Sequence, residues 1–283
     1  MPPVEALTLH EAADRLGVHY MTVYRWVRTG RLPAHRSGVE WRVDAADVEQ
    51  AGRRGREPRA DVGARGRPRS RAAAGERLRS RMMAGDEAGA WAVIDESLAS
   101  GTTPAEVYLE VVAPALEAVG AGWAAGEVSV AVEHRATAVT SRLLGRLGPQ
   151  FARPGRKRGS VVIGAPSGDE HALPASLLGD VLRGAGFDVV DLGANTPPES
   201  FVESARGAAR LVAVLIGVTN RGNDAAVQAT TAALHDAAVG APVLVGGGAV
   251  PDAADALRLG GDGWSGPHAR SALAALEEIS PRS

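Results

Sequence analysis

The sequence predicts a multidomain protein with three folded parts: an α-helical winged helix-turn-helix, a four-helix bundle and a Rossmann-like α/β domain with a parallel sheet. A helix, glycine turn, helix and hairpin pattern fills residues 1–52, and apolar residues at helical spacing fill 75–150. Short apolar strands then alternate with helices through 157–283. A chain of 283 residues is long enough for about two or three such domains.

The composition narrows the class of protein. The chain has no cysteine, which excludes disulfides, a thiolate metal site and a cysteine nucleophile. Its formal net charge of −2 argues against a uniformly basic nucleic-acid-binding surface. No signal peptide is visible, and no unbroken apolar run approaches the roughly 20 residues that span a bilayer. We therefore expect a soluble cytoplasmic protein with no membrane partner.

The first part begins with the spacing of a capping box, because Thr8 is followed three residues later by Glu11. A second helix is expected over 19–29, then a β-hairpin over 32–43 and a last helix over 45–51. Three apolar residues of the second helix are expected to face inward: Val23, Trp26 and Val27. Helix, turn, helix and hairpin in this order predict a winged helix-turn-helix.

Several spacings in this part resemble the DNA-binding domains of excisionase and MerR-type proteins. The matching stretches are Leu16-Gly17-Val18, Thr22-Val23-Tyr24-Arg25-Trp26, Leu32-Pro33 and Trp41-Arg42-Val43. The resemblance implies double-stranded operator DNA as a partner. We expect six residues on the second helix and the wing to contact it: Thr22, Tyr24, Arg25, Arg28, Arg36 and Arg42. For any single arginine a solvated surface charge is the alternative, whereas Trp26 and Trp41 are expected in the core.

Residues 53–74 are expected to form an arginine-rich linker. The stretch 53–71 holds eight arginines among Gly, Pro and Ala, with almost no large apolar residue that could be buried in a core. It is either a plain tether or an additional source of phosphate attraction.

Residues 75–150 are expected to form an antiparallel four-helix bundle. Pro104 follows Thr103 at the position of a first helical residue, and the joints between the helices are short and polar or contain glycine. The apolar residues that recur at helical spacing include Leu78, Met82, Val93, Ile94, Val107, Val111, Leu116 and Val119. Residues 151–159 form a second, shorter basic linker.

In the last part, strands are expected near 160–165, 187–192, 211–217, 243–246 and 262–264. Ligands of such parallel sheets bind at the carboxyl ends of the strands. Asp169 and His171 lie just beyond the end of the first strand. An imidazole can give one nitrogen to a metal while a carboxylate holds the other N–H, so the pair suits a cobalt ligand and its orienting partner. A lone loop histidine without a ligand is the alternative.

The surroundings of this pair resemble the cobalamin-binding domain of methionine synthase, methylmalonyl-CoA mutase and their relatives, over about 157–276. The resemblance implies that His171 is the lower axial ligand of cobalt and that Asp169 orients it. It places Thr219 near the buried nucleotide tail, with Gly246, Gly247 and Gly248 allowing close backbone approach; a simple turn is the alternative for the glycines. The family has glycine three residues after the histidine, where this chain has Pro174.

The bundle contains a second pattern, in which Trp123 is followed ten residues later by Glu133 and then by His134. This pattern resembles the CarH-type photoreceptors, which are MerR-family light-responsive repressors that use adenosylcobalamin. The resemblance implies that Trp123 and Glu133 cap the adenosyl group. Those proteins often carry a histidine after the tryptophan, which binds cobalt after illumination, where this chain has Ala124. Either water or His134 then takes that position, or the response to light differs. A buried tryptophan and an ordinary surface Glu-His pair are the alternative.

Together these features predict a DNA-binding transcriptional regulator, a repressor rather than an enzyme, located at the nucleoid. The resemblance implies adenosylcobalamin as cofactor and a homotetramer in the dark that dissociates in light. Two alternatives stay open: a regulator that senses cobalamin without light, and a corrinoid-dependent enzyme module.

Overall fold

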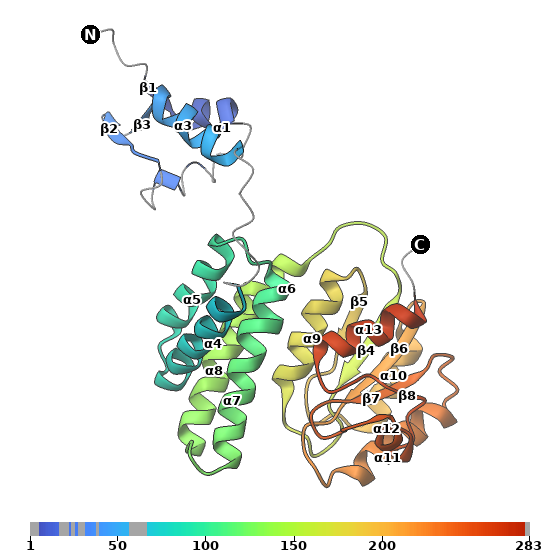
Figure 1. Ribbon diagram of the computed structural model, residues 1–283. Helices are drawn as coiled ribbons and strands as arrows, with labels where there is room; N and C mark the ends of the chain where they lie inside the picture. The colour runs from blue at the N-terminus through green and yellow to red at the C-terminus, as the bar shows by residue number, and fades with distance from the viewer. Residues whose placement is uncertain are drawn as a thin grey trace, which may run out of the picture. The chain divides into compact units, whose positions relative to one another are not determined.

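A computed structural model describes residues 6–16, 23, 26–27, 32–37, 40–56 and 67–280. The chain divides into two compact units, Met1–Gly66 and Arg67–Ser283, which are described separately (Figure 1). The architecture is multidomain, with helical regions and a Rossmann-like domain that has a parallel sheet.

The first unit has the strands and helices of the predicted winged helix-turn-helix within its described residues. They are β1 (Ala6–Thr8), α1 (Leu9–Leu16), β2 (His35–Ser37), β3 (Glu40–Asp44) and α3 (Ala45–Arg56). The predicted capping box is confirmed, because the Thr8 N–H donates to Glu11 Oε2 (2.7 Å) and the Glu11 N–H donates to Thr8 Oγ1 (3.2 Å). The sequence did not indicate β1, which pairs antiparallel with β3 and completes a three-stranded sheet.

The core of the first unit includes Val23, which is fully buried, and Trp26 and Trp41 pack against it. The inward face predicted for the second helix is therefore confirmed at the positions that the structure describes.

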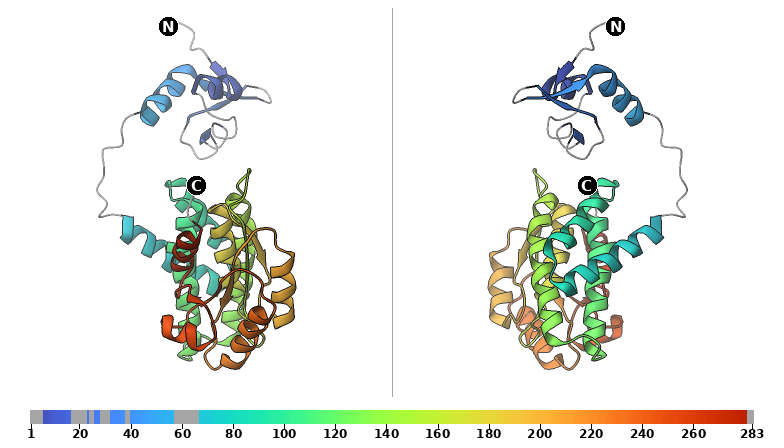
Figure 2. Two further views of the ribbon diagram at one scale, coloured as in Figure 1. Left: turned by 90° about the vertical axis from the view of Figure 1, so that its right-hand side faces the viewer. Right: turned by 90° about the vertical axis from the view of Figure 1, so that its left-hand side faces the viewer.

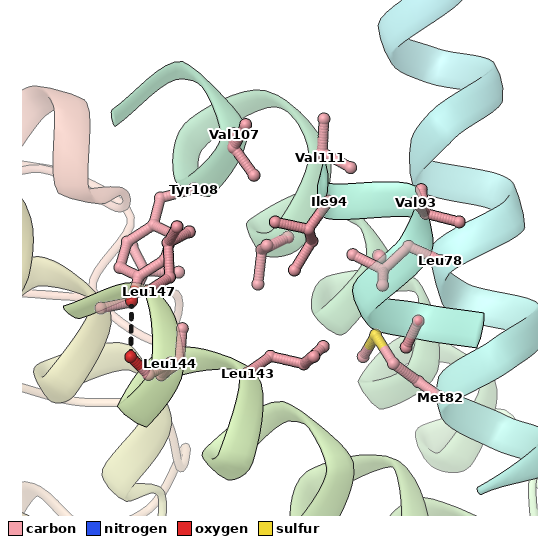
Figure 3. Packing of buried hydrophobic residues seen from close by; sticks show 14 of the residues in the cluster. Leu78, Met82, Val93, Ile94, Val107, Tyr108, Val111, Leu143, Leu144 and Leu147 are labelled. Atoms are coloured by element: carbon pink, nitrogen blue, oxygen red, sulfur yellow. Dashed lines mark hydrogen bonds between the residues drawn. The ribbon is translucent and has the colours of Figure 1, made fainter. Parts of the chain in front are cut away.

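The second unit begins with a bundle whose helices are α4 (Arg67–Ala84), α5 (Glu87–Ala99), α6 (Pro104–Val107), η1 (Tyr108–Val112), α7 (Ala113–Ala124) and α8 (Val130–Leu147). α6, η1 and α7 follow one another without a break and form one long helix with a π-helical segment. In that segment the Ala113 N–H donates to the Tyr108 carbonyl five residues earlier, directly before Pro114, which has no N–H. The predicted four-helix bundle is confirmed, and Figure 3 shows its core, with Leu78, Ile94, Val111 and Leu143.

The expected linker 53–74 is wrong at both ends. α3 continues to Arg56, and α4 begins at Arg67. The start of α4 is stabilised because the Arg71 guanidinium donates to Glu106 and Glu110, and Ala74 is buried in the bundle core. Arginine-rich sequence can therefore be helical where acidic partners and a core face are available.

The long helix Pro104–Ala124 has 21 residues and a mean hydropathy of 1.2, enough by length and composition alone to cross a membrane. No single unbroken apolar run in the sequence suggested it. Its buried face supplies the bundle core with Val107, Tyr108, Val111, Val112, Ala115 and Val119. Core helices of this kind pass the same test, so the finding is weak evidence for a membrane span.

The Rossmann-like domain has five parallel strands in the order β5-β4-β6-β7-β8. The strands are β4 (Ser160–Gly164), β5 (Asp188–Asp191), β6 (Leu211–Gly217), β7 (Val243–Gly246) and β8 (Gly263–Trp264). The helices are α9 (Ala172–Gly184), α10 (Pro198–Gly207), α11 (Asp224–Asp236), α12 (Ala253–Arg258) and α13 (Ala269–Ile279). All five predicted strands are present, and they alternate with helices as predicted.

Alternate residues of the strands are buried against helices on opposite faces of the sheet. Ile163 of β4 packs with α9 and α13 residues, whereas Val162 packs with α10 and α11 residues. The bundle core includes Leu177 and Val181 of α9. The bundle therefore lies against the α9 and α13 side of the domain, as the views of Figures 1 and 2 also show.

Candidate cobalamin-binding site

The loop between β4 and α9 brings Asp169 and His171 together at the carboxyl edge of the sheet. His171 Nδ1 lies 2.7 Å from Asp169 Oδ1, and the His171 backbone N–H donates to the same oxygen at 3.2 Å. The Asp169 side chain is fully buried, while that of His171 is 43% exposed. With Nδ1–H held by the carboxylate, the lone pair of a neutral ring is on Nε2. An imidazole held in this way could bind the cobalt of a corrinoid through Nε2.

The Asp169 carboxylate is also held by the loop that follows β6. The backbone N–H groups of Thr219 and Asn220, which follow β6, donate to Asp169 Oδ2 at 2.6 and 3.2 Å. Thr219, expected from the family resemblance to approach the cofactor, is thus connected to the site through its backbone. Asp169 therefore links the β4–α9 loop to the β6–α11 loop.

These contacts set the protonation of the pair. Burial tends to raise the pKa of Asp169, but hydrogen bonds from the His171 ring and from the Thr219, His171 and Asn220 backbones outweigh it, and the pKa is lowered. The hydrogen bond to Asp169 raises the pKa of His171, and the charges of Glu133 and Glu170 add to this. An ionised Asp169 is the form that makes an imidazole a strong metal ligand.

Sequence reasoning missed two asparagines that hold this loop. Asn195, which follows β5, accepts a hydrogen bond from the Gly168 N–H at Oδ1 (2.8 Å) and donates its own N–H to the Asp169 carbonyl (2.8 Å). Asn223, before α11, donates Nδ2–H to the Ser167 carbonyl (2.9 Å). Asn195 has φ 51°, a left-handed conformation that asparagine tolerates. An asparagine just after a strand was the available signal.

The glycines after β7 have a reason within the protein itself. A Cβ on Gly246 would lie 2.5 Å from the Gly266 carbonyl oxygen, and one on Gly247, where φ is 105°, would lie 2.5 Å from that of Val218. Both positions therefore need glycine so that neighbouring loops can approach closely. Gly248 has open space around a Cβ. Close packing of the chain accounts for the first two glycines without a ligand.

Pro174 lies in the first turn of α9, whose N-cap is His171. A proline there removes no intrahelical hydrogen bond. Its ring lines a pocket of about 290 Å³ together with Leu109 and Leu116 of the bundle and His268 before α13. The departure from the family glycine thus places an apolar ring between the bundle and the Rossmann-like domain.

Trp123, Glu133 and His134 lie near the loop that joins α7 to α8. Trp123 is 48% exposed, which contradicts the alternative of a buried tryptophan. Glu133 is half-buried, accepts a hydrogen bond from Thr137 Oγ1 (2.7 Å) and contributes to the electrostatic environment of His171. The side chain of His134 is 76% exposed, with Nε2 3.7 Å from Glu133 Oε2. Of the two residues, Glu133 adds its charge to the electrostatic environment of His171, whereas His134 faces solvent.

The bundle is fastened to the Rossmann-like domain at its other end. The buried hydroxyl of Tyr108 donates to Asp180 Oδ2 of α9 (2.9 Å) and lies 3.3 Å from the Leu144 carbonyl, the bond drawn in Figure 3. Burial, together with the Asp180 charge, raises the pKa of Tyr108, so the phenol stays protonated and can donate. Arg270 of α13 adds an ion pair with Glu110 (3.3 Å).

In the first unit, the structure describes two of the six residues expected to contact DNA. Arg36 is exposed on β2, with its guanidinium carbon 5.2 Å from the centre of the Trp41 ring. Arg42 on β3 is half-buried and interacts electrostatically with Glu11. Thr22, Tyr24, Arg25 and Arg28 lie outside the described residues.

Three protein families match the chain. Two are described as B12 binding domains and match residues 74–147 and 159–277, which correspond to the bundle and the Rossmann-like domain. The third is described as a helix-turn-helix domain and matches residues 6–54. These matches support a cobalamin-binding protein with a helix-turn-helix region.

Curated relatives are similar over less than half of this chain. Trimethylamine corrinoid protein 1 of Methanosarcina acetivorans is 32% identical over 43% of the chain and 57% of its own length. Trimethylamine corrinoid protein of Methanosarcina barkeri is 29% identical over 40% and 54%, respectively. The chain thus spans little more than half the length of these relatives.

Among solved structures, the monomethylamine corrinoid protein of Methanosarcina barkeri aligns with a TM-score of 0.62 at 21% identity. The alignment covers 71% of this chain and 96% of that one. This likeness establishes the fold that the bundle and the Rossmann-like domain share with a corrinoid protein.

Proposed function

We propose that the chain is a transcriptional regulator in which cobalamin bound at His171 controls DNA binding by the helix-turn-helix region. The observation that carries this proposal is the presence of both functions in one chain. Residues 6–54 match a DNA-binding type of domain, and 74–147 and 159–277 match B12 binding domains. The hydrogen bond between Asp169 and His171 supports His171 as the residue that would hold such a cofactor. On this proposal the protein is a cytoplasmic, nucleoid-associated regulator and not an enzyme.

The finer proposal is that the cofactor is adenosylcobalamin, that light is the signal, and that the protein is a repressor and a tetramer in the dark. Adenosylcobalamin would supply a cobalt–carbon bond that light can break. His171 would hold the cofactor from the Rossmann-like domain, while Glu133 and the exposed Trp123 would contact it from the bundle. An exposed indole near the α7–α8 loop is free to pack against a bound group. Removal of that group would then change how the bundle supports assembly.

The experiment is to measure the assembly of purified full-length protein loaded with adenosylcobalamin or methylcobalamin, in the dark and after green light. We expect the dark adenosyl form to be the large species in size-exclusion chromatography with light scattering. Trp123→Ala should retain cobalamin but assemble to the same extent in all four conditions. The matched control is Trp91→Ala, which removes an indole from α5, where it stacks against Arg146 at 3.8 Å. If the parent protein assembles to the same extent with either cobalamin, in the dark and in light, the photoreceptor hypothesis is refuted. The remaining hypothesis is then a cobalamin sensor that does not respond to light.

Ala124 makes the illuminated state informative. Because no histidine follows Trp123, we expect the illuminated protein to lack a stable bis-histidine absorption spectrum and to release cobalamin more readily. If such a spectrum forms, the exposed His134 is the residue to test, and His134→Ala should abolish it.

A second candidate function, a corrinoid carrier for methyl transfer, is favoured by the similarity to the trimethylamine corrinoid proteins. Selection of a random-sequence DNA library with the full chain separates the two candidates. A carrier would show no sequence enrichment, whereas a regulator should enrich a defined operator.

A further inference from the structure

The segment Arg153-Pro154-Gly155-Arg156-Lys157-Arg158 joins the bundle to β4 and is strongly basic. Figure 1 shows its loop arching over one end of the second unit, with the α7–α8 loop at the opposite end. Since β4 starts directly after it, the segment lies at the amino edge of the sheet, away from the Asp169–His171 edge. The cobalamin site therefore does not account for this charge.

The end of the segment is held in place by the domain. The Arg158 N–H donates to the Gly186 carbonyl (3.0 Å), and the Arg158 guanidinium lies 4.2 Å from the centre of the Phe187 ring. Arg210 donates to the carbonyls of Lys157 (3.2 Å) and Arg158 (3.0 Å), which adds its own charge to the same surface. The backbone of the basic segment is therefore held in place where its charged side chains project.

The basic residues of this surface differ from those of α4 in their partners. On α4, Arg77, Arg79 and Arg81 pair with Glu96, Glu76 and Asp86 at 3.0, 3.5 and 2.7 Å. Within the part of the chain that the structure describes, no ion pair involves the exposed Arg153 and Arg156. Among the described residues, Lys157 donates to the Arg153 carbonyl, and Glu277 is the acidic partner of the largely buried Arg158. The exposed charges thus remain available to an external anion.

The geometry points to an accessory surface for the phosphate backbone of double-stranded DNA, formed by Arg153, Arg156, Lys157 and Arg210. This inference rests on the proposed function, because DNA is the polyanion that a helix-turn-helix regulator brings near the chain. Unpaired guanidinium and ammonium groups bind phosphates with release of counterions, and they do so without reading sequence. The surface is expected to strengthen and orient binding while the first unit selects the operator.

The test compares two triple variants of the full chain that remove the same charge. Arg153→Gln/Arg156→Gln/Lys157→Gln removes the unpaired charges, and Arg77→Gln/Arg79→Gln/Arg81→Gln removes paired ones. We expect the first variant to weaken binding to operator and to unrelated DNA by the same factor. The slope of log affinity against log salt should fall by about 1 for each phosphate that the variant no longer neutralises. The second variant should keep the parent slope.

An unchanged salt slope in the first variant, with normal folding by circular dichroism, would overturn the inference while leaving the proposed function intact. A change in oligomeric state at an unchanged slope per protomer would also overturn it and would identify the surface as an interface between copies. A parent chain that binds no DNA would instead refute the proposed function itself.

Discussion

The two ends of the helical bundle differ in how they meet the Rossmann-like domain. At one end, Tyr108 is fully buried, bonds to Asp180 of α9 and stacks near Phe151, with ring centres 4.7 Å apart. Near the other end, Trp123 is 48% exposed and the His134 side chain faces solvent. Fifteen residues of one long helix separate Tyr108 from Trp123, or about 22 Å along its axis.

This difference indicates that one end of the bundle is held firmly against the Rossmann-like domain and the other end is less constrained. The Tyr108 end is held by burial and by a polar contact, so displacing it would expose apolar surface and remove the phenol donor from the partly buried Asp180 carboxylate. The Trp123 end has little such cost and lies on the side of the bundle that carries Glu133, one of the acidic residues that raise the pKa of His171. A ligand held by His171 would therefore act on the less constrained end.

The largest effect is expected from Tyr108→Ala, which removes a buried ring and its hydrogen bonds. It should lower the free energy of unfolding of the second unit by about 3–5 kcal/mol, measured by urea titration. Tyr108→Phe is the matched control, because it deletes only the hydroxyl and leaves Asp180 its contact with Arg183 at 2.9 Å. It should cost about 1–3 kcal/mol. If Tyr108→Ala were as stable as the parent, the Tyr108 end of the bundle would not be held by this side chain.

The next effect concerns the ligand itself. His171→Ala should lose cobalamin or bind it at least about 100-fold more weakly, whereas Asp169→Asn should weaken binding by about 10–100-fold because it acts through the imidazole. Spectroscopic titration of the purified variants measures both. His235→Ala is the control, since His235 pairs with Asp262 elsewhere in the same domain. Equal retention by His171→Ala with an unchanged spectrum would remove His171 from the site.

A smaller effect is expected from Asn195→Ala. The substitution removes the side-chain oxygen that accepts a hydrogen bond from the Gly168 N–H. It also puts alanine, which has no side-chain hydrogen bond to offset the strain, into the left-handed conformation at φ 51°. Affinity for cobalamin should fall by about 10-fold, close to the lower bound for residues that orient a ligand. Asn195→Gly keeps the backbone conformation and should lose less affinity for cobalamin. If Asn195→Ala lost as much affinity as His171→Ala, direct contact between Asn195 and the cofactor would be indicated.

The smallest effect on stability is expected from Trp123→Ala. Because the side chain is nearly half exposed, the free energy of unfolding without cofactor should change by about 1 kcal/mol or less. The same urea titration measures it beside Tyr108→Ala. A loss of stability comparable to that of Tyr108→Ala would mean that both ends of the bundle are equally constrained, which would contradict the proposed difference between them.

The local pattern of residues along the sequence determined many of the helices, strands and short-range contacts of this protein. Alternating apolar strands and helices predicted every strand of the Rossmann-like sheet, and the three-residue spacing of Thr8 and Glu11 predicted a cap that the structure confirms. The two-residue spacing of Asp169 and His171 predicted their hydrogen bond, because both lie on one short loop after a strand. In each case the interacting groups are near neighbours in the chain, so sequence spacing is close to spatial distance.

Only the tertiary structure decided contacts between distant residues. Tyr108 and Asp180 are 72 positions apart, and their bond depends on how the bundle packs against α9. Asn195 holds Gly168 across 27 positions because β5 and β4 are neighbours in the sheet. The arginines at 67–74 are helical because Glu106 and Glu110 of another helix accept hydrogen bonds from Arg71, which composition alone cannot show. Packing brings such groups together only after the whole domain has formed, and that is why the sequence by itself left them undetermined.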